Sequence, residues 1–129
     1  MNVPGNLKYT ESNEWVNLEG TAGTIGISDY AQDQLSDIVF AEVIVNEGDT
    51  IKKGETIATV ESVKAAADVY TPVSGKVVRI NDSLGGAPEV INSDPYGAAW
   101  IIKLELSNPT EMDALMDAAA YDQFIKAQK

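Results

Sequence analysis

The sequence predicts a mainly β fold built as a single domain from residue 1 to residue 129. Two observations carry this prediction. Short runs rich in Val, Ile, Thr and Tyr recur along the chain, and clusters of Gly, Asn, Asp and Pro separate them. The length of 129 residues lies within the usual size of one domain, and a hydrophobic content of 44% suffices for a core without a disulfide or metal.

The first third of the chain alternates strands with one short helix. Ser28 and Asp29 mark the start of that helix, since a hydroxyl caps the first turn and an acid favours it. We expect Tyr30, Ala31 and Leu35 to share one face of it. Strands are expected at residues 7–10, 15–18, 24–27 and 38–44.

The middle of the chain predicts a β-hairpin at about residues 56–72. Lys64 lies midway between the flanking strands, with Gly54 ten residues before it and Gly75 eleven after. This symmetry places Lys64 at or near the hairpin tip. Strands are expected at residues 50–51, 56–60, 69–71 and 76–80.

The last third predicts a loop, a buried strand and helices. Gly85, Gly86 and Pro88 indicate the loop, and residues 99–106 the strand. Pro109 suits the first position of a helix, so helices are expected at about residues 109–127. Apolar residues at helical spacing there predict a packed face: Met112, Leu115, Met116, Ala119, Ala120, Tyr121, Phe124 and Ile125.

The composition excludes several functions. The chain has no Cys and no His, which excludes His-dependent nucleophilic sites and structural zinc of the usual kind. A net charge of -11 argues against nucleic acid as a partner. The acidic stretches lack calcium-loop spacing, so no metal site is predicted. The first residues show no secretory signal pattern and no apolar run could span a membrane, so we expect a cytoplasmic protein.

Lys64 is the candidate functional residue. Val63 precedes it and three alanines follow, so no other charge adjoins it. A lysine at an exposed, tight turn is open to a modifying enzyme, which could convert its amine into an amide. A solvated turn lysine remains the alternative at this point.

Ordered motifs along nearly the whole chain resemble the H-protein family of the glycine cleavage system. The lysine motif is Glu61-Ser62-Val63-Lys64-Ala65, followed by Pro72-Val73-Ser74-Gly75. The other matching segments are Ser12 to Trp15, Ile25 to Ala31, Asp37 to Phe40, Ile91 to Trp100, and the helical end with Leu115, Ala120 and Tyr121.

This resemblance implies a barrel-sandwich hybrid fold of the lipoyl/biotinyl type, with lipoate amide-linked to Lys64. The implied role is that of a carrier rather than a catalyst. The lipoyl group would take an aminomethyl group from a pyridoxal-phosphate glycine decarboxylase and pass it to a tetrahydrofolate-dependent aminomethyltransferase. Dihydrolipoyl dehydrogenase would then reoxidise it, and a lipoate ligase or a lipoyl/octanoyl transferase would attach it.

The resemblance also implies a cleft that receives the loaded arm. Its matching residues here are Ser12, Glu14 and Asp68. A carboxylate could pair with the ammonium of the load, and Ser12 could accept a hydrogen bond. From the residues alone there is an equal alternative, in which Glu14 lies on a loop and both acids are solvated surface residues.

Three departures from the family pattern are present, and none of them touches Lys64. Asn13 replaces a usual His, Ser36 replaces a usual Gly, and Val43 to Asn46 replaces a usual Leu-Pro stretch. They leave open the alternative that this chain is an H-like protein that acts in lipoate relay or regulation. Val63 and Ala65 disfavour a biotinyl carrier, which usually has Met on both sides of its lysine. The remaining alternative is an enzyme that uses the carboxylate of Glu14 or Asp68.

Overall fold

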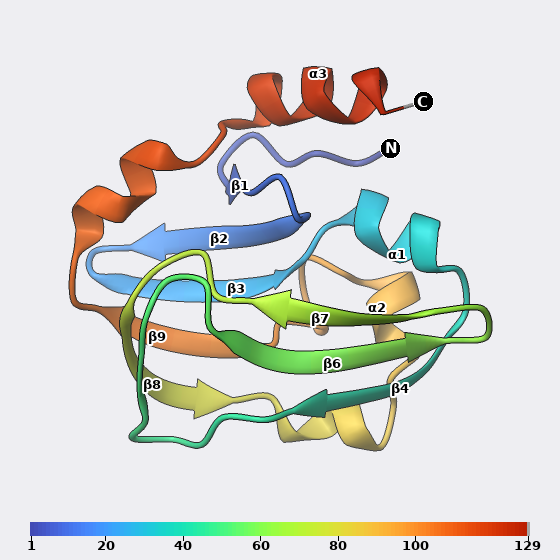
Figure 1. The fold of residues 1–129 in the computed structure, drawn as a ribbon, viewed down its shortest axis with the longest axis horizontal. Helices are drawn as coiled ribbons and strands as arrows, with labels where there is room; N and C mark the ends of the chain where they lie inside the picture. The colour runs from blue at the N-terminus through green and yellow to red at the C-terminus, as the bar shows by residue number, and fades with distance from the viewer. Residues whose placement is uncertain (129) are drawn as a thin grey trace.

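The computed structural model describes residues 1–128. Two β-sheets packed face to face form the body of the protein (Figure 1). The larger sheet has six strands, all antiparallel, and the smaller has three. In spatial order the larger sheet contains β1 (Lys8–Tyr9), β2 (Glu14–Glu19), β3 (Ala22–Ile27), β9 (Ile102–Leu106), β8 (Gly75–Ile80) and β5 (Thr50–Ile51). The smaller contains β4 (Ile38–Val43), β6 (Thr56–Ser62) and β7 (Ala66–Tyr70).

Side-chain alternation explains why these segments form sheets. In β9, Ile102, Leu104 and Leu106 are buried between the sheets, while Lys103 and Glu105 point outwards. At Gly75 in β8, a Cβ atom would clash with the Glu105 carbonyl oxygen of β9, so only glycine fits this crossing.

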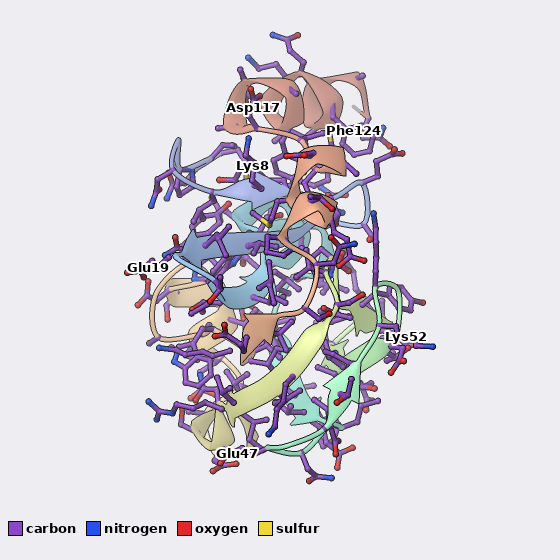
Figure 2. All side chains as sticks on the ribbon, turned by 90° about the vertical axis from the view of Figure 1, so that its left-hand side faces the viewer. Lys8, Glu19, Glu47, Lys52, Asp117 and Phe124 are labelled. Atoms are coloured by element: carbon purple, nitrogen blue, oxygen red, sulfur yellow. The ribbon has the colours of Figure 1, made fainter. Side chains whose placement is uncertain are left out.

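Helical segments cover the ends and edges of the sheets. They are α1 (Asp29–Leu35), the 3₁₀ helix η1 (Asp82–Gly85), α2 (Val90–Ser93), the 3₁₀ helix η2 (Pro109–Ala114) and α3 (Ala118–Ala127). Ser28 caps α1 as predicted, because its side chain accepts a hydrogen bond from the Ala31 N–H. Figure 2 shows Asp117 and Phe124, at α3, at one end of the molecule and Glu47 at the opposite end.

The interior divides into an aliphatic and an aromatic part. The aliphatic core fills the space between the sheets, and Val16, Ile25, Ile57 and Leu104 are among its fully buried members. The aromatic cluster joins α3 to the N-terminal strands. It consists of Leu7, Tyr9, Trp15, Tyr30, Tyr121 and Ile125. Tyr9 and Tyr121 stack with ring centroids 4.4 Å apart.

The structure corrects two predictions for helical faces. Tyr30 packs in the aromatic cluster, whereas Ala31 and Leu35 pack on the aliphatic core, because successive helical residues point about 100° apart. The C-terminal helical region is broken at Leu115 to Asp117. Met116 there pairs with Tyr9 in a β-bridge, and Asp117 caps a new helix.

The break in the C-terminal region changes which of its residues are buried. Because α3 starts afresh at Ala118, its helical phase is independent of η2, and Ala119 and Ala120 are exposed. Two further predictions were wrong in detail: β9 begins only at Ile102, after an irregular stretch from Ala99, and the predicted loop around Pro88 contains η1 and α2.

Candidate functional site

Lys64 lies at the tip of the β6–β7 hairpin. Register pairs Glu61 with Ala66, so only Ser62 to Ala65 form the turn, and Lys64 is exposed. The strands therefore extend further than the sequence predicted, which makes the turn tighter. Figure 1 shows this turn at the right-hand end of the molecule, beside the segment that joins α1 to β4.

The Ser62 side chain closes the turn. Its Oγ accepts hydrogen bonds from the N–H groups of Lys64 and Ala65, at 3.3 and 3.0 Å. The Ser62 N–H donates to the Ala65 carbonyl at 2.7 Å. Neither Val63 nor Lys64 has the positive φ that the favoured two-residue hairpin turns use. The hydroxyl of Ser62 thus accepts hydrogen bonds from turn N–H groups that the turn geometry alone would leave without an acceptor.

The tip is also held to the neighbouring strand. The Val63 N–H donates to the Asp37 carbonyl at 3.0 Å, one residue before β4. The Val63 side chain is 65% exposed, and on β4 Val39 and Phe40 are 57% and 42% exposed. The lysine is consequently presented on a fixed turn beside an apolar surface.

The remaining predicted attachment residues flank the turn and do not line the predicted cleft. Glu61 is exposed on β6, opposite Phe40 on one side and Ala66 on the other. Ala65 is exposed at the start of the returning chain. Small, exposed neighbours leave the Lys64 amine sterically open.

A cleft of about 190 Å³ lies further along the same hairpin, and all three predicted arm residues line it. Ser12 lies in the turn before β2, Glu14 is the first residue of β2, and Asp68 lies on β7. Ala31, Gln34 and Leu35 of α1 form a further wall. At the rise of an extended chain, Asp68 lies roughly 13 Å along β7 from Lys64.

Glu14 is the most buried polar group of the cleft, at 2% exposure. Its Oε1 accepts hydrogen bonds from the hydroxyls of Thr10 and Ser12, at 2.6 and 2.7 Å, and its Oε2 accepts from the Tyr70 N–H at 3.2 Å. The alternative of a loop position with a solvated carboxylate is therefore wrong for Glu14. The residue opens β2, and burial turns its carboxylate into a fixed acceptor.

Glu14 has no cationic partner within residues 1–128. The single ion pair in this part of the chain joins Lys126 to Asp122 on α3. Hydrogen bonds from neutral donors thus satisfy a buried negative charge that no protein cation neutralises. Such a site favours a positively charged guest.

Asp68 differs from Glu14 in exposure. It lies opposite Thr59 on β6 and its side chain is exposed at the cleft rim. Val60 and Val69, both buried, add apolar lining to the cleft. The cleft therefore combines a buried carboxylate, an exposed carboxylate and apolar walls.

Two of the three departures flank this cleft. Asn13 lines it with φ 73°, and Ser36, one residue after Leu35, has φ 72° and ψ −152°. Val43 to Asn46 begins at the far end of β4 from the hairpin tip, since Val43 pairs with Ala58 and Ile38 with Ser62. This third departure is thus remote from Lys64.

Sequence reasoning missed the contribution of α1 to the cleft. Ala31, Gln34 and Leu35 have the spacing of one helical face, which was the signal available. Their convergence with Ser12 and Asp68 depends on tertiary packing. Within the described residues, no group of three or more His, Cys, Asp or Glu side chains could hold a metal ion. No helix in that part of the chain is long and apolar enough to cross a membrane.

Comparison with known proteins gives matches over almost the full chain. The model of the family described as glycine cleavage H-protein matches residues 7–128. The glycine cleavage system H protein of Symbiobacterium thermophilum is 54% identical over 125 residues, covering 97% of each chain. That of Coprothermobacter proteolyticus is 52% identical, covering 97% of this chain and 98% of the relative.

A solved structure shares the fold. The crystal structure of a glycine cleavage system H protein from Mycobacterium marinum superposes with a TM-score of 0.83 at 30% identity. The match covers 94% of this chain and 97% of that one. The predicted mainly β, barrel-sandwich architecture is confirmed by this likeness.

Proposed function

The chain belongs to the glycine cleavage H-protein family and is an H protein of the glycine cleavage system, its lipoyl carrier; on this premise we propose that lipoate is amide-linked to Nζ of Lys64. The observation that carries the proposal is the hairpin tip. There Lys64 is exposed on a turn closed by Ser62, and no carboxylate pairs with its amine within residues 1–128.

The residues around Lys64 fit a covalently attached arm. An enzyme that acylates the amine must approach the lysine from outside, and the small or apolar neighbours Val63 and Ala65 leave it room. A lipoate ligase or a lipoyl/octanoyl transferase would contact Val63 together with Val39 and Phe40. The bond from the Val63 N–H to Asp37 keeps the turn in one conformation for that encounter.

When bound, lipoate supplies a dithiolane that accepts an aminomethyl group and returns as a dithiol after the group has been passed on. We infer that the chain itself is carrier and substrate rather than catalyst. Its partners would be the pyridoxal-phosphate glycine decarboxylase, the tetrahydrofolate-dependent aminomethyltransferase and dihydrolipoyl dehydrogenase.

The cleft serves in this proposal as the resting place of the loaded arm. Glu14 would hold the terminal ammonium, because it is a buried carboxylate without a protein cation. Asp68 would add a second negative charge at the rim, and Ser12 keeps Glu14 in place through its hydrogen bond. The apolar walls limit the access of water to the arm.

Intact-mass measurement after incubation with a lipoate ligase tests the attachment. The wild type should gain one lipoyl mass, and Lys64→Arg should gain none. Lys53→Arg is the matched control, because Lys53 is also exposed in a turn but lies at the opposite end of β6. Modification of a peptide without Lys64 would contradict the proposal.

A further inference from the structure

The hydroxyl of Tyr121 connects the C-terminal helix to the cleft without lining it. Tyr121, on α3, is fully buried, and its OH lies 2.6 Å from Ser28 Oγ and 2.9 Å from Asn13 Oδ1. Neither the attachment of lipoate nor the proposed ammonium site uses this group. It nevertheless contacts Asn13, which lines the cleft, and Ser28, the N-cap of the helix that forms another wall.

The donors in this network follow from the chemistry of the groups. Asn13 Oδ1 can only accept, so the Tyr121 hydroxyl donates to it. The Ser28 Oγ already accepts from the Ala31 N–H, and its own proton is free to be donated to Tyr121. The phenol therefore donates one hydrogen bond, to Asn13, and can accept the other, from Ser28.

Asn13 is the first of the two residues that this hydroxyl positions. It adopts φ 73°, in the left-handed region that Asn tolerates better than most residues other than glycine. Its N–H donates to the Thr10 carbonyl at 3.1 Å, and its carbonyl accepts from the Ser28 N–H at 2.9 Å. Ser12 and Glu14 flank it, so its conformation sets the direction of both cleft side chains.

Ser28 is the second. As the N-cap of α1 it fixes the start of the helix whose Ala31, Gln34 and Leu35 line the cleft. The Tyr121 hydroxyl thus adds a side-chain link between the Asn13 turn and the α1 N-terminus, beside the backbone hydrogen bond from the Ser28 N–H to the Asn13 carbonyl. The stacking of Tyr121 on Tyr9 anchors the ring from behind.

We propose that Tyr121 is a positioning residue of the arm cleft, through which α3 braces the Asn13 turn against the N-terminus of α1 in addition to their direct backbone hydrogen bond. The inference rests on the proposed use of this cleft by the lipoyl arm. Loss of the hydroxyl would leave the buried Ser28 hydroxyl without its acceptor and the half-buried Asn13 Oδ1 without its donor. This would raise the population of an opened cleft about tenfold, as expected for a buried hydrogen-bond partner left unpaired.

Tyr121→Phe tests the proposal, because it keeps the ring stack and removes only the hydroxyl. Tyr9→Phe is the matched control: it removes the other hydroxyl of the same stack, which donates to the Pro4 carbonyl at 2.6 Å, away from the cleft. The first readout is amide hydrogen exchange in the unmodified protein. It is independent of lipoate, so its outcome is separate from that of the attachment proposal.

Tyr121→Phe should speed exchange about tenfold at the amides of Ser28, Ala31 and Glu14 but not at Leu104 in the core. Tyr9→Phe should leave the three cleft amides as in the wild type. Equal exchange in the two variants, or a uniform rise that includes Leu104, would show only loss of global stability and overturn the proposal.

A second variant approaches the same link from the other side. Asn13→Gly tolerates φ 73° and so keeps the turn, but it removes the acceptor for Tyr121. It should also speed exchange at Ser28 and Ala31, and adding Tyr121→Phe should then have a smaller effect than in the wild type. Independent effects of the two substitutions would contradict the coupling.

The final readout uses the lipoylated protein carrying its aminomethyl load. The load should be lost to water several-fold faster in Tyr121→Phe than in Tyr9→Phe, as followed by intact mass. Faster exchange at the cleft amides without faster loss would confine Tyr121 to a structural role and overturn its positioning role for the arm.

Discussion

Replacing Ser36 by glycine should stabilise this protein. Ser36 ends α1 with φ 72° and ψ −152°, a region of backbone conformation populated almost only by glycine. Holding a residue with a Cβ atom there costs about 1–3 kcal/mol. Within the described residues the Ser36 hydroxyl makes no hydrogen bond that would offset this strain. The backbone N–H, which donates to the Gln32 carbonyl at 2.9 Å, is retained by any substitution except proline.

The expected magnitude is a balance of two terms. Glycine relieves the strain but adds about 0.4–1 kcal/mol of conformational entropy to the unfolded chain. The free energy of unfolding should therefore rise by about 1 kcal/mol. A domain of 129 residues has an unfolding entropy of about 0.27 kcal/mol/K, so Tm should rise by about 4 °C.

Urea denaturation of Ser36→Gly and Ser36→Ala measures the effect. Ser36→Ala removes the same hydroxyl but keeps the Cβ atom, so it should leave the midpoint nearly unchanged. The m-value should be the same in all three proteins, because the surface exposed on unfolding is the same. If Ser36→Gly is no more stable than Ser36→Ala, the strain assigned to this residue is absent and the reasoning fails.

Three further predictions concern the cleft, the turn and the aromatic cluster. Glu14→Gln keeps the shape of the buried side chain and removes its charge, so the loaded arm should decay about tenfold faster by intact mass, whereas Glu11→Gln, an exposed neighbour, should decay like the wild type. Ser62→Ala should slow lipoylation of Lys64 about fivefold by loosening the turn, and Ser62→Thr, which keeps the hydroxyl, should restore the rate. Burial raises the pKa of Tyr96 to about 12 and the pKa of Tyr121 well above its usual 10.0. These phenols therefore bind protons more tightly in the folded state than in the unfolded chain. The stability that this difference contributes is complete below about pH 10 and is lost as pH rises above it. Tyr121→Phe should therefore give a shallower fall of the urea midpoint between about pH 10 and pH 12, and an unchanged slope would exclude this titration.

The hairpin could be predicted from the sequence, although part of the reasoning behind it does not hold. In the sequence, the nearly equal spacing of Gly54 and Gly75 from Lys64 indicates the hairpin tip. Gly54 has φ 93° in a turn, whereas Gly75 is needed where β8 crosses close to the Glu105 backbone. The two glycines thus have unrelated physical causes. What located the tip correctly was the pair of β-rich runs on either side of Lys64.

The arm cleft could be predicted only in part. Ser12, Glu14 and Asp68 came from a family resemblance, and no local pattern marked Glu14 as buried. Its burial arises because β2 begins at Glu14 and the backbone of Tyr70, 56 residues away, donates to it. Tyr121 lies 108 residues after Asn13 in the sequence, so only the packing of α3 shows that the two residues are hydrogen-bonded.

The two departures that flank the cleft share one physical feature. Asn13 and Ser36 are the only residues other than glycine with positive φ among those the structure describes, and each is bound by a side chain from far along the sequence. The Tyr121 hydroxyl holds Asn13, and the Asn92 amide donates to the Ser36 carbonyl at 2.9 Å.

Asn92 extends the second of these links to the lysine. Its Oδ1 accepts from the Ile38 N–H at 2.9 Å, so the Asn92 side chain spans Asp37, whose carbonyl accepts from Val63 at the hairpin tip. The Asn13 turn and the C-cap of α1, which have these two positive φ angles, are therefore the points at which the remote residues Tyr121 and Asn92 connect the cleft and the Lys64 turn to the rest of the fold. Relieving strain at Ser36 should consequently leave the tip in place, because the Asn92 bonds use backbone atoms that glycine retains.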